Sequence, residues 1–408
     1  MPGMAPFGMD LDFITSNAII YVLIAWVVML VVAKGLKLQN HGFEIKAYSI
    51  IYKNEGVQSV LTRMLTRSRR GIRVFADVSV VAGFVMMGFA FWFLFSNISA
   101  YFVKPTEFAE VTVLIPGVTL TSASAIINFL LCIPIVLIMH EGAHGIVATL
   151  ERIKIKTGGF AIFIAMFAGF VEPDEEEFNK AKKISKLRVI GAGATSNVLF
   201  SLFLGIILLT NPLFAIIMPE PILGAFYESP DGVLVLSLIE GSGAEQAGVL
   251  PNDVITGIGD DPVNTAADLQ LIGLEPGETV DVSIMRDGTA LTIPVVVMES
   301  PDEPGRGLIG VLRDNSFAYQ PIYDFIKWDN PQVSLFLLWL WMISFFIGII
   351  NMLPLPILDG GKFIHSIIDK KISEKSVGIV MWSIYGMTFV LFGLNIGLSY
   401  AKSGWFTI

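Results

Sequence analysis

Two histidines and a glutamate in the segment His140-Glu141-Gly142-Ala143-His144 have the types and spacing of a metal site that performs chemistry. On an α-helix, residues four apart differ by about 40° of rotation and about 6 Å of rise, so both imidazoles face the same way. They can hold one Zn²⁺ between them, with Glu141 beside the ion as a base toward water. Soluble metalloproteases use the same H-E-x-x-H spacing. The motif therefore predicts a hydrolytic zinc site.

The sequence around this motif is that of a membrane helix. The preceding run from Ser124 to Met139 contains no charged residue, and an ionisable cluster beside it would be costly in lipid unless it had a function. In a soluble chain the same pattern often occurs by chance on a solvated helix face, but this chain is 54% hydrophobic and only 15% charged. The composition indicates a polytopic membrane protein, and the net charge of -9 argues against a nucleic-acid partner.

Six runs of about 20 apolar residues are candidate transmembrane spans. They lie near residues 15–34, 74–96, 124–150, 188–210, 332–353 and 377–399. Most of the 27 Lys and Arg residues fall in three alternate sections, Lys34–Arg73, Arg152–Arg188 and Lys362–Lys375. If all six runs cross the cell membrane, the positive-inside rule makes that side cytosolic and places both termini outside. We expect the basic connector 36–73 to be a solvated linker at the cytosolic membrane surface.

Two imidazoles leave a catalytic zinc ion one protein ligand short, because such sites usually have three. The only other histidines are His41, in the basic connector, and His365. The segment Asn351-Met-Leu-Pro-Leu-Pro-Ile-Leu-Asp-Gly-Gly361 is more suggestive, because two prolines interrupt the fifth span and Asp359 follows in apolar surroundings. Irregular backbone at membrane depth persists where it is buried in protein or lines a wet cavity. The prolines could simply end a helix, but that alternative leaves Asp359 and the Gly-Gly pair unexplained.

The H-E-x-x-H motif in one membrane helix and N-x-x-P-x-P-x-L-D-G-G in a later one closely resemble the site-2 protease family of intramembrane zinc metalloproteases. Both motifs are intact, and the resemblance covers most of the chain from about residue 120 onward. It implies that His140, His144 and Asp359 bind one Zn²⁺ and that Glu141 is the general base. It also implies a site that opens toward the cytosolic half of the membrane. The charge distribution agrees, because the motif lies near the cytosolic end of its span, shortly before Arg152.

Two further stretches match this family less tightly. Residues Gly158 to Pro173 are too short to span and rich in Gly and Phe, and they resemble a membrane-dipping hairpin that engages substrate as an added strand. A surface-associated amphipathic loop is the alternative. Asn197, after a small-residue run in the fourth span, either packs between helices or holds the scissile segment or its oxyanion. The substrate-binding residues implied by the resemblance are Gly158, Gly159, Gly169, Phe170, Asn197 and Asn351.

A charged insert rich in Gly and Pro separates the fourth and fifth spans. The stretch from Gly232 to Ile255 reads as a strand, a Gly turn, a short helix and another strand. Later alternation and the turn Asp287-Gly288 complete a hairpin, and the whole closely resembles a PDZ domain. The domain either binds chain termini as a peptide ligand or acts as a steric gate. The resemblance implies a groove opposite a helix near Thr265 to Leu271, formed by Gly232, Val233 and Leu234.

The sequence therefore predicts a polytopic α-helical membrane protein with about six transmembrane helices and a small α/β PDZ-like domain inserted between the fourth and fifth. We expect an intramembrane zinc endopeptidase that cuts the transmembrane helices of substrate proteins in regulated intramembrane proteolysis, with the PDZ insert outside the cell. A catalytically silent PDZ-bearing scaffold would not need Glu141, and a zinc transporter would want more ionisable residues along its helices. The expected parts are 1–123 with two helices and the connector, 124–219 with H-E-x-x-H and the hairpin, the PDZ-like insert 220–315, and 316–408 with a linker and the last two helices.

Overall fold

The structure is a computed structural model and divides into two compact units. One unit comprises Pro2–Leu204 and Trp339–Ile408, and the other comprises Gly205–Leu338. The described residues run from 18 to 403, except 106–107, 121, 165, 219, 229–231, 240, 252, 266–267, 270–271, 287–288, 301–304, 315–320, 324, 327, 329, 370 and 372. The second unit coincides approximately with the polar insert that the sequence indicates between the fourth and fifth spans.

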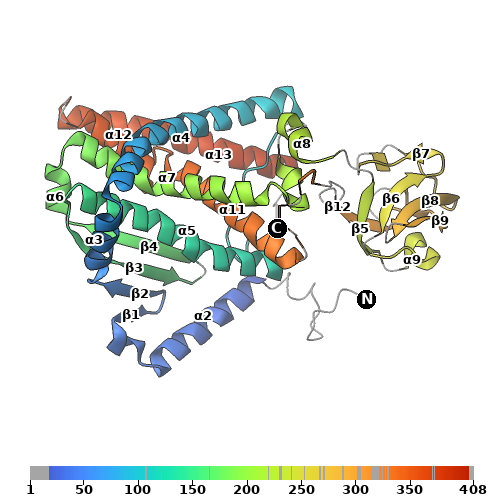
Figure 1. The fold of residues 1–408 in the computed structure, drawn as a ribbon, viewed down its shortest axis with the longest axis horizontal. Helices are drawn as coiled ribbons and strands as arrows, with labels where there is room; N and C mark the ends of the chain where they lie inside the picture. Colours follow the sequence, from blue (N-terminus) through green and yellow to red (C-terminus); the bar gives the residue numbers. More distant parts are fainter. Residues whose placement is uncertain are drawn as a thin grey trace. The chain divides into compact units, whose positions relative to one another are not determined.

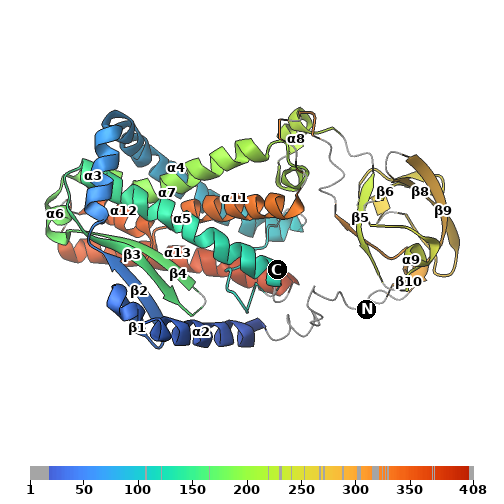
Figure 2. The same ribbon diagram turned by 60° about the horizontal axis from the view of Figure 1, so that its bottom comes forward.

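Five helices of the described chain are long and apolar enough to cross a membrane, and each matches one of the expected spans. In Figures 1 and 2, α4, α5, α7 and α13 run roughly alongside one another. The first expected span contains α2, Ala18–Gly35, whose apolar part is shorter than the other five. Five of the six expected spans therefore contain a helix that is long and apolar enough to cross a membrane. The five are α4 Arg69–Val103, α5 Ala123–Leu150, α7 Lys183–Leu208, α11 Pro331–Asn351 and α13 Glu374–Ser403.

Small residues let these helices approach closely. A Cβ atom on Gly191 of α7 would lie 2.5 Å from the carbonyl oxygen of Ser79 on α4, so only glycine fits at this crossing. Around it, Met86, Ile190 and Phe363 are buried in one apolar cluster that joins α4, α7 and a short helix after α11. Large apolar side chains on the outer helix faces are exposed, as expected of surfaces that meet lipid. The packing therefore fixes α7 against its neighbours along the segment that includes Asn197.

A four-stranded antiparallel sheet lies beside α5, with its strands in chain order (Figure 2). Its first two strands come from the basic connector, so the expectation of a solvated linker there is wrong. The connector pairs with the hairpin because β2 aligns antiparallel with β3, for example Lys53 with Gly159. Helix α3, Val57–Arg67, then returns to pack on α5, where Leu61 contacts Gly145. The strands are β1 Phe43–Lys46, β2 Ser49–Asn54, β3 Ile155–Phe163 and β4 Met166–Pro173.

The expected hairpin is formed by β3 and β4. Gly159 pairs with Phe170, and Gly159 allows close approach to β2, since a Cβ atom there would lie 1.9 Å from the Tyr52 carbonyl oxygen. Among the described strands, β4 pairs only with β3, so its other edge has no strand partner. The described chain also contains the short helices η1 Leu38–His41, α6 Glu175–Lys180, η3 Pro212–Ile217 and α8 Glu220–Phe226.

The backbone after α11 is irregular, as the two prolines predict. The helix ends at Asn351, and a new helix, α12, begins at Asp359 and ends at Ile368. Both glycines after Asp359 are required by close backbone contacts: a Cβ atom on Gly360 would lie 2.2 Å from the Met352 carbonyl oxygen, and one on Gly361 would lie 2.2 Å from that of Leu355. The Gly-Gly pair therefore folds α12 back onto the break, and this fixes the position of Asp359.

The insert has the strand, turn, helix and strand order expected from its sequence. Its core consists of alternate strand residues such as Val233, Val235, Ile255 and Ile284, all essentially inaccessible to solvent. The expected turn at 287–288 and part of the helix near 265–271 lie outside the described residues. The elements are β5 Val233–Leu238, α9 Gly243–Ala247, β6 Val254–Ile258, β7 Asp261–Pro262, β8 Thr279–Arg286, β9 Thr289–Val296, β10 Met298–Glu299, β11 Gly307–Leu308 and β12 Val311–Asp314.

The sheet order of the insert corrects the expected peptide groove. The strands lie in the order β12-β5-β6-β8-β9, so β5 is interior. Leu234 pairs with Asp314 of β12 on one side and with Val254 of β6 on the other. A peptide cannot add to a strand whose two edges are already paired. Of the groove predicted at Gly232, Val233 and Leu234, the edge at Leu234 is therefore occupied by β12.

One buried ion pair stabilises this insert. Arg286 donates from Nε and Nη2 to the two carboxylate oxygens of Asp253, each at 2.7 Å, and the backbone N–H of Leu250 donates to the same carboxylate at 2.8 Å. Burial alone would raise the pKa of Asp253, but these donors outweigh it and hold that pKa below its ordinary value. The bidentate geometry links the end of β8 to the turn that precedes β6.

Candidate metal centre

Three side chains from two helices converge on one point. His140 and His144 lie one turn apart on α5, and Asp359 is the first residue of α12. Asp359 Oδ2 lies 3.1 Å from His140 Nε2 and 3.0 Å from His144 Nε2, and the two Nε2 atoms are 3.2 Å apart. Within the described part of the chain, this is the one group of three His, Cys, Asp or Glu side chains with the geometry of a metal site. The structure thus brings together the two histidines and the aspartate that the sequence indicates as metal ligands. Asp359 lies 219 residues after His140 and 215 residues after His144.

The spacing of these atoms fits a zinc ion. Ligands at about 2.0–2.1 Å around a tetrahedral zinc lie about 3.3 Å from one another, close to the separations observed here. Two imidazoles and one carboxylate also match the donor set of catalytic zinc sites, which keep a fourth position for water or substrate. His140 and Asp359 are buried, so the site is shielded from bulk solvent. The residues present therefore fit the ion that the resemblance implies.

Gly193 of α7 forms the wall of this site, a role that the sequence did not reveal. A Cβ atom on Gly193 would lie 2.3 Å from His144 Nε2 and 2.7 Å from His140 Nε2. Any larger residue would therefore occupy the space of the ligand atoms. Helical spacing could have suggested this, because Val189, Gly193 and Asn197 are four apart and share one face of α7.

That face of α7 also orients the two imidazoles. His144 Nδ1 lies 2.7 Å from the Val189 carbonyl oxygen and donates its proton there, which leaves Nε2 free to bind a metal. His140 Nδ1 lies 3.2 Å from Asn197 Nδ2. Asn197 is fully buried, and its backbone carbonyl oxygen accepts a hydrogen bond from Ser344 of α11. Asn197 therefore contacts a ligand of the site directly.

Glu141 lies beside the edge of the sheet. The backbone N–H of Val171 on β4 donates to Glu141 Oε2 at 3.0 Å. On the same strand, a Cβ atom on Gly169 would lie 3.1 Å from Glu141 Cγ and 3.2 Å from Leu137 Cβ, so glycine allows β4 to approach α5. The carboxylate expected to act as a base therefore sits between the metal-binding residues and an open strand edge.

The other residues expected to bind substrate are distributed differently. A Cβ atom on Gly158 of β3 would meet Val57 at 3.1 Å, and one on Gly159 would meet the backbone of β2. Phe170 follows Gly169 on β4, so its side chain points to the opposite face of the sheet. Asn351 is the half-buried last residue of α11. Of the hairpin residues named from the sequence, Gly169 alone directly adjoins the Glu141 side chain among the described contacts.

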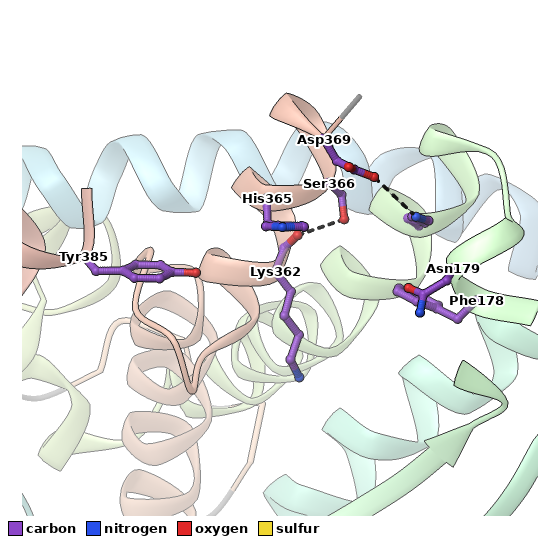
Figure 3. A pocket seen from close by; sticks show the side chains of 8 residues that line it. Phe178, Asn179, Lys362, His365, Ser366, Asp369 and Tyr385 are labelled. Carbon is purple, nitrogen blue, oxygen red and sulfur yellow. Dashed lines mark hydrogen bonds and ion pairs between the residues drawn. The ribbon is translucent and has the colours of Figure 1, made fainter. Parts of the chain in front are cut away.

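A polar cavity of about 210 Å³ lies next to α12 (Figure 3). Lys362 lines it and reaches back to the metal-binding carboxylate, with Nζ 3.9 Å from Asp359 Oδ1. His365, which the sequence left as a weak ligand candidate, lines this cavity and not the metal site. On the far side, the Lys186 ammonium pairs with Asp369 at 4.0 Å. The lining residues are Phe178, Asn179, Lys186, Lys362, His365, Ser366, Asp369 and Tyr385.

Two histidines, an aspartate and an adjacent glutamate, all carried by or next to apolar helices, define a metal-dependent hydrolase site in a multi-pass membrane protein. The chain belongs to peptidase family M50, whose sequence model matches residues 128–392. This is the site-2 protease family that the two motifs resemble, so the chain is a site-2-type metalloprotease by family.

Two related proteins match this chain over different lengths. The uncharacterized protein MJ0971 of Methanocaldococcus jannaschii is 24% identical over 413 residues, which cover 93% of this chain and 98% of that protein. The zinc metalloprotease RasP of Oceanobacillus iheyensis is 30% identical over 198 residues, which cover 36% of this chain and 47% of RasP. The family is one of peptidases, and the second relative is a zinc metalloprotease.

Solved structures of PDZ domains resemble part of the chain. The PDZ domain of the SdrC-like protein from Listeria monocytogenes has 19% identity and a TM-score of 0.19, over 22% of this chain and 93% of that one. The corresponding domain from Listeria innocua has 26% identity and a TM-score of 0.18, over 20% of this chain and 93% of that one. The description of the insert as PDZ-like therefore rests on its own strands and helix.

Proposed function

We propose that this chain is an intramembrane zinc endopeptidase that cuts transmembrane helices of partner proteins, as in regulated intramembrane proteolysis. The observation that carries this proposal is the convergence of His140, His144 and Asp359 among helices apolar enough to span a bilayer, with Glu141 beside them. A buried ionisable cluster among such helices is costly unless it has a function. Family membership supports peptide-bond hydrolysis as that function.

The roles of the side chains follow from their positions. A bound zinc ion would lower the pKa of its water molecule and would polarise the scissile carbonyl group. Glu141 accepts the proton of the attacking water and transfers it to the departing amine nitrogen. His140, His144 and Asp359 hold the ion, and Val189 fixes the proton of His144 on Nδ1.

The open edge of β4 is suited to hold the substrate. A peptide bond within a helix is shielded by its own hydrogen bonds, so the substrate helix must unwind before cleavage. An unwound segment can pair with β4 as an added strand, which satisfies its backbone groups in a region without water. The hydrogen bond from the Val171 N–H to Glu141 supports this arrangement, because that strand edge directly adjoins the proposed base. Gly158, Gly159, Phe170 and Asn351 remain proposed substrate-binding residues.

The cavity beside α12 offers a supply of water for hydrolysis. Its lining carries several polar groups, and about 210 Å³ is large enough for several water molecules. Lys362 connects this cavity to the carboxylate of Asp359. We propose that water enters the site from this side.

Zinc removal tests the proposed activity. The protein in lipid vesicles with a membrane-embedded peptide substrate should cleave it, lose cleavage after treatment with a zinc chelator, and regain it when zinc is added back. Added magnesium should not restore cleavage, because a site of two imidazoles and a carboxylate favours zinc over a hard cation that prefers oxygen ligands. Cleavage that continues at the same rate in zinc-free protein would contradict the proposal.

The sidedness of the site is also part of the proposal. The distribution of basic residues places the active site toward the cytosol and the PDZ-like insert outside. Exposed positions in the two sections are Lys180 and Asp260, and the native Cys132 is buried. An impermeant thiol reagent added outside sealed cells should label Lys180→Cys only after the membrane is opened, and Asp260→Cys at once. Labelling of both variants from the same side would refute this topology.

The insert is proposed to limit access to the site or to bind a peptide. Because β5 is paired on both sides, a peptide that extends this sheet would have to pair with β12 or β9, the ends of the described order. The proposed zinc ligands His140, His144 and Asp359 and the proposed base Glu141 all lie outside Gly205–Leu338.

A further inference from the structure

Asn197 has an unsatisfied atom at the centre of the metal site. Its side chain is fully buried, its Nδ2 lies 3.2 Å from His140 Nδ1, and its Oδ1 has no hydrogen-bond partner. A buried amide oxygen without a partner destabilises the folded protein, so an explanation is required. The neighbouring imidazole of His140 supplies this explanation.

The contact between Asn197 and His140 depends on which ring nitrogen carries the proton. In the observed arrangement, Asn197 Nδ2 donates to Nδ1, so the proton of His140 must be on Nε2, where it donates to Asp359 Oδ2 at 3.1 Å. A metal needs the lone pair of that same Nε2, which moves the proton to Nδ1. The Nδ1–H would then face the N–H groups of Asn197, and two donors would oppose each other.

A half-turn of the Asn197 amide removes this conflict. The amide oxygen and nitrogen have nearly the same size, so the rotation needs little extra space. It brings Oδ1 against the Nδ1–H of His140 and gives the unsatisfied oxygen a partner. We propose that Asn197 is a positioning residue for zinc, whose amide serves one tautomer of His140 without the metal and the other with it.

An amide is suited to this position for a chemical reason. A carboxylate accepts but does not donate, so it would favour only the metal-binding tautomer of His140. A hydrocarbon side chain would favour neither tautomer. Asparagine is the residue of this shape that satisfies the ring both before and after the metal enters. The inference deepens the proposed function and rests on zinc being held by His140, His144 and Asp359.

Zinc affinity of two variants, measured in detergent without substrate, tests the inference. Asn197→Leu keeps the size but cannot accept a hydrogen bond, so its zinc Kd should rise about 10- to 100-fold, the usual cost of losing a partner of a ligand. Asn197→Asp still accepts from Nδ1–H, so its zinc Kd should stay within about threefold of the parent. The matched control is Asn128→Leu. Like Asn197, Asn128 has a buried amide, but it lies on α5 and donates within its own helix. It is about 18 Å along the helix axis from His140.

A second measurement needs no variant. Nitrogen NMR of protein labelled in its four histidines should show that the proton of His140 moves from Nε2 to Nδ1 when zinc is added. The inference is wrong if Asn197→Leu binds zinc as tightly as the parent, or if Asn197→Asp loses zinc as severely as Asn197→Leu. Failure of the parent itself to bind zinc would instead refute the proposed function, so the two failures are distinguishable.

Discussion

Replacing Glu141 by glutamine should abolish peptide cleavage while the protein keeps its zinc. Glutamine has nearly the size of glutamate and its amide oxygen can still accept from the Val171 N–H, so the contact between α5 and β4 survives. It cannot accept a proton from water. Loss of a general base alone costs about 10²- to 10⁴-fold, and loss of the carboxylate that orients the attacking water adds to this. We therefore expect cleavage to fall by about 10³-fold or more.

The contrasting variant is Asp359→Ala, which removes one of three protein ligands and should lower the zinc content itself. Both quantities can be measured on the same preparations, zinc by elemental analysis and cleavage with a membrane-embedded peptide. A Glu141→Gln protein that still cleaves would refute the protease mechanism. An equal loss of zinc in both variants would show that Glu141 holds the ion and does not act only as a base.

Replacing Gly193 by alanine should prevent zinc binding although it adds a single methyl group. That methyl carbon would lie 2.3 Å from His144 Nε2 and 2.7 Å from His140 Nε2, far inside van der Waals contact. The imidazoles are fixed on their other sides by Val189 and Asn197, so they cannot move away without losing those partners. We expect the zinc Kd to rise at least about 100-fold, as for loss of an essential partner of the ligands, and cleavage to be lost with it.

The matched control for this variant is Gly88→Ala on α4, where an added Cβ atom meets nothing within 4 Å. Alanine favours a helix over glycine by about 1 kcal/mol, so neither substitution weakens its helix. Both proteins should therefore remain folded in the membrane, and only Gly193→Ala should lack zinc. If Gly193→Ala binds zinc like the control, the ligand atoms do not occupy the positions described here.

Much of the metal site follows from local sequence. Helical geometry places His140 and His144 on one face whatever surrounds them, and the charge-free run before them identifies the helix as a membrane span. Two prolines between Asn351 and Asp359 predict the break that the structure contains. These features depend on residues close together in the chain, which is why the sequence could indicate the side chains that converge at this site.

Strand partners were decided by the tertiary structure. The connector was expected to be a linker because β1 and β2 are short and mix apolar with charged residues, yet β2 pairs with β3 about 100 residues later. Likewise, Val233 to Leu238 is correctly predicted as a strand. Its own residues do not predict that it pairs with β12. Pairing depends on which distant backbone groups arrive at an open edge, and alternation within one strand does not encode this.

The sequence by itself determined which side chains can hold zinc and which one can move a proton, because these follow from residue chemistry and from the fixed spacing of a helix. Only the tertiary structure decided what surrounds them: Gly193 against the ligand nitrogens, Asn197 on His140, and the edge of β4 on Glu141. These neighbours come from other helices and strands, and their approach depends on the packing of small residues between helices.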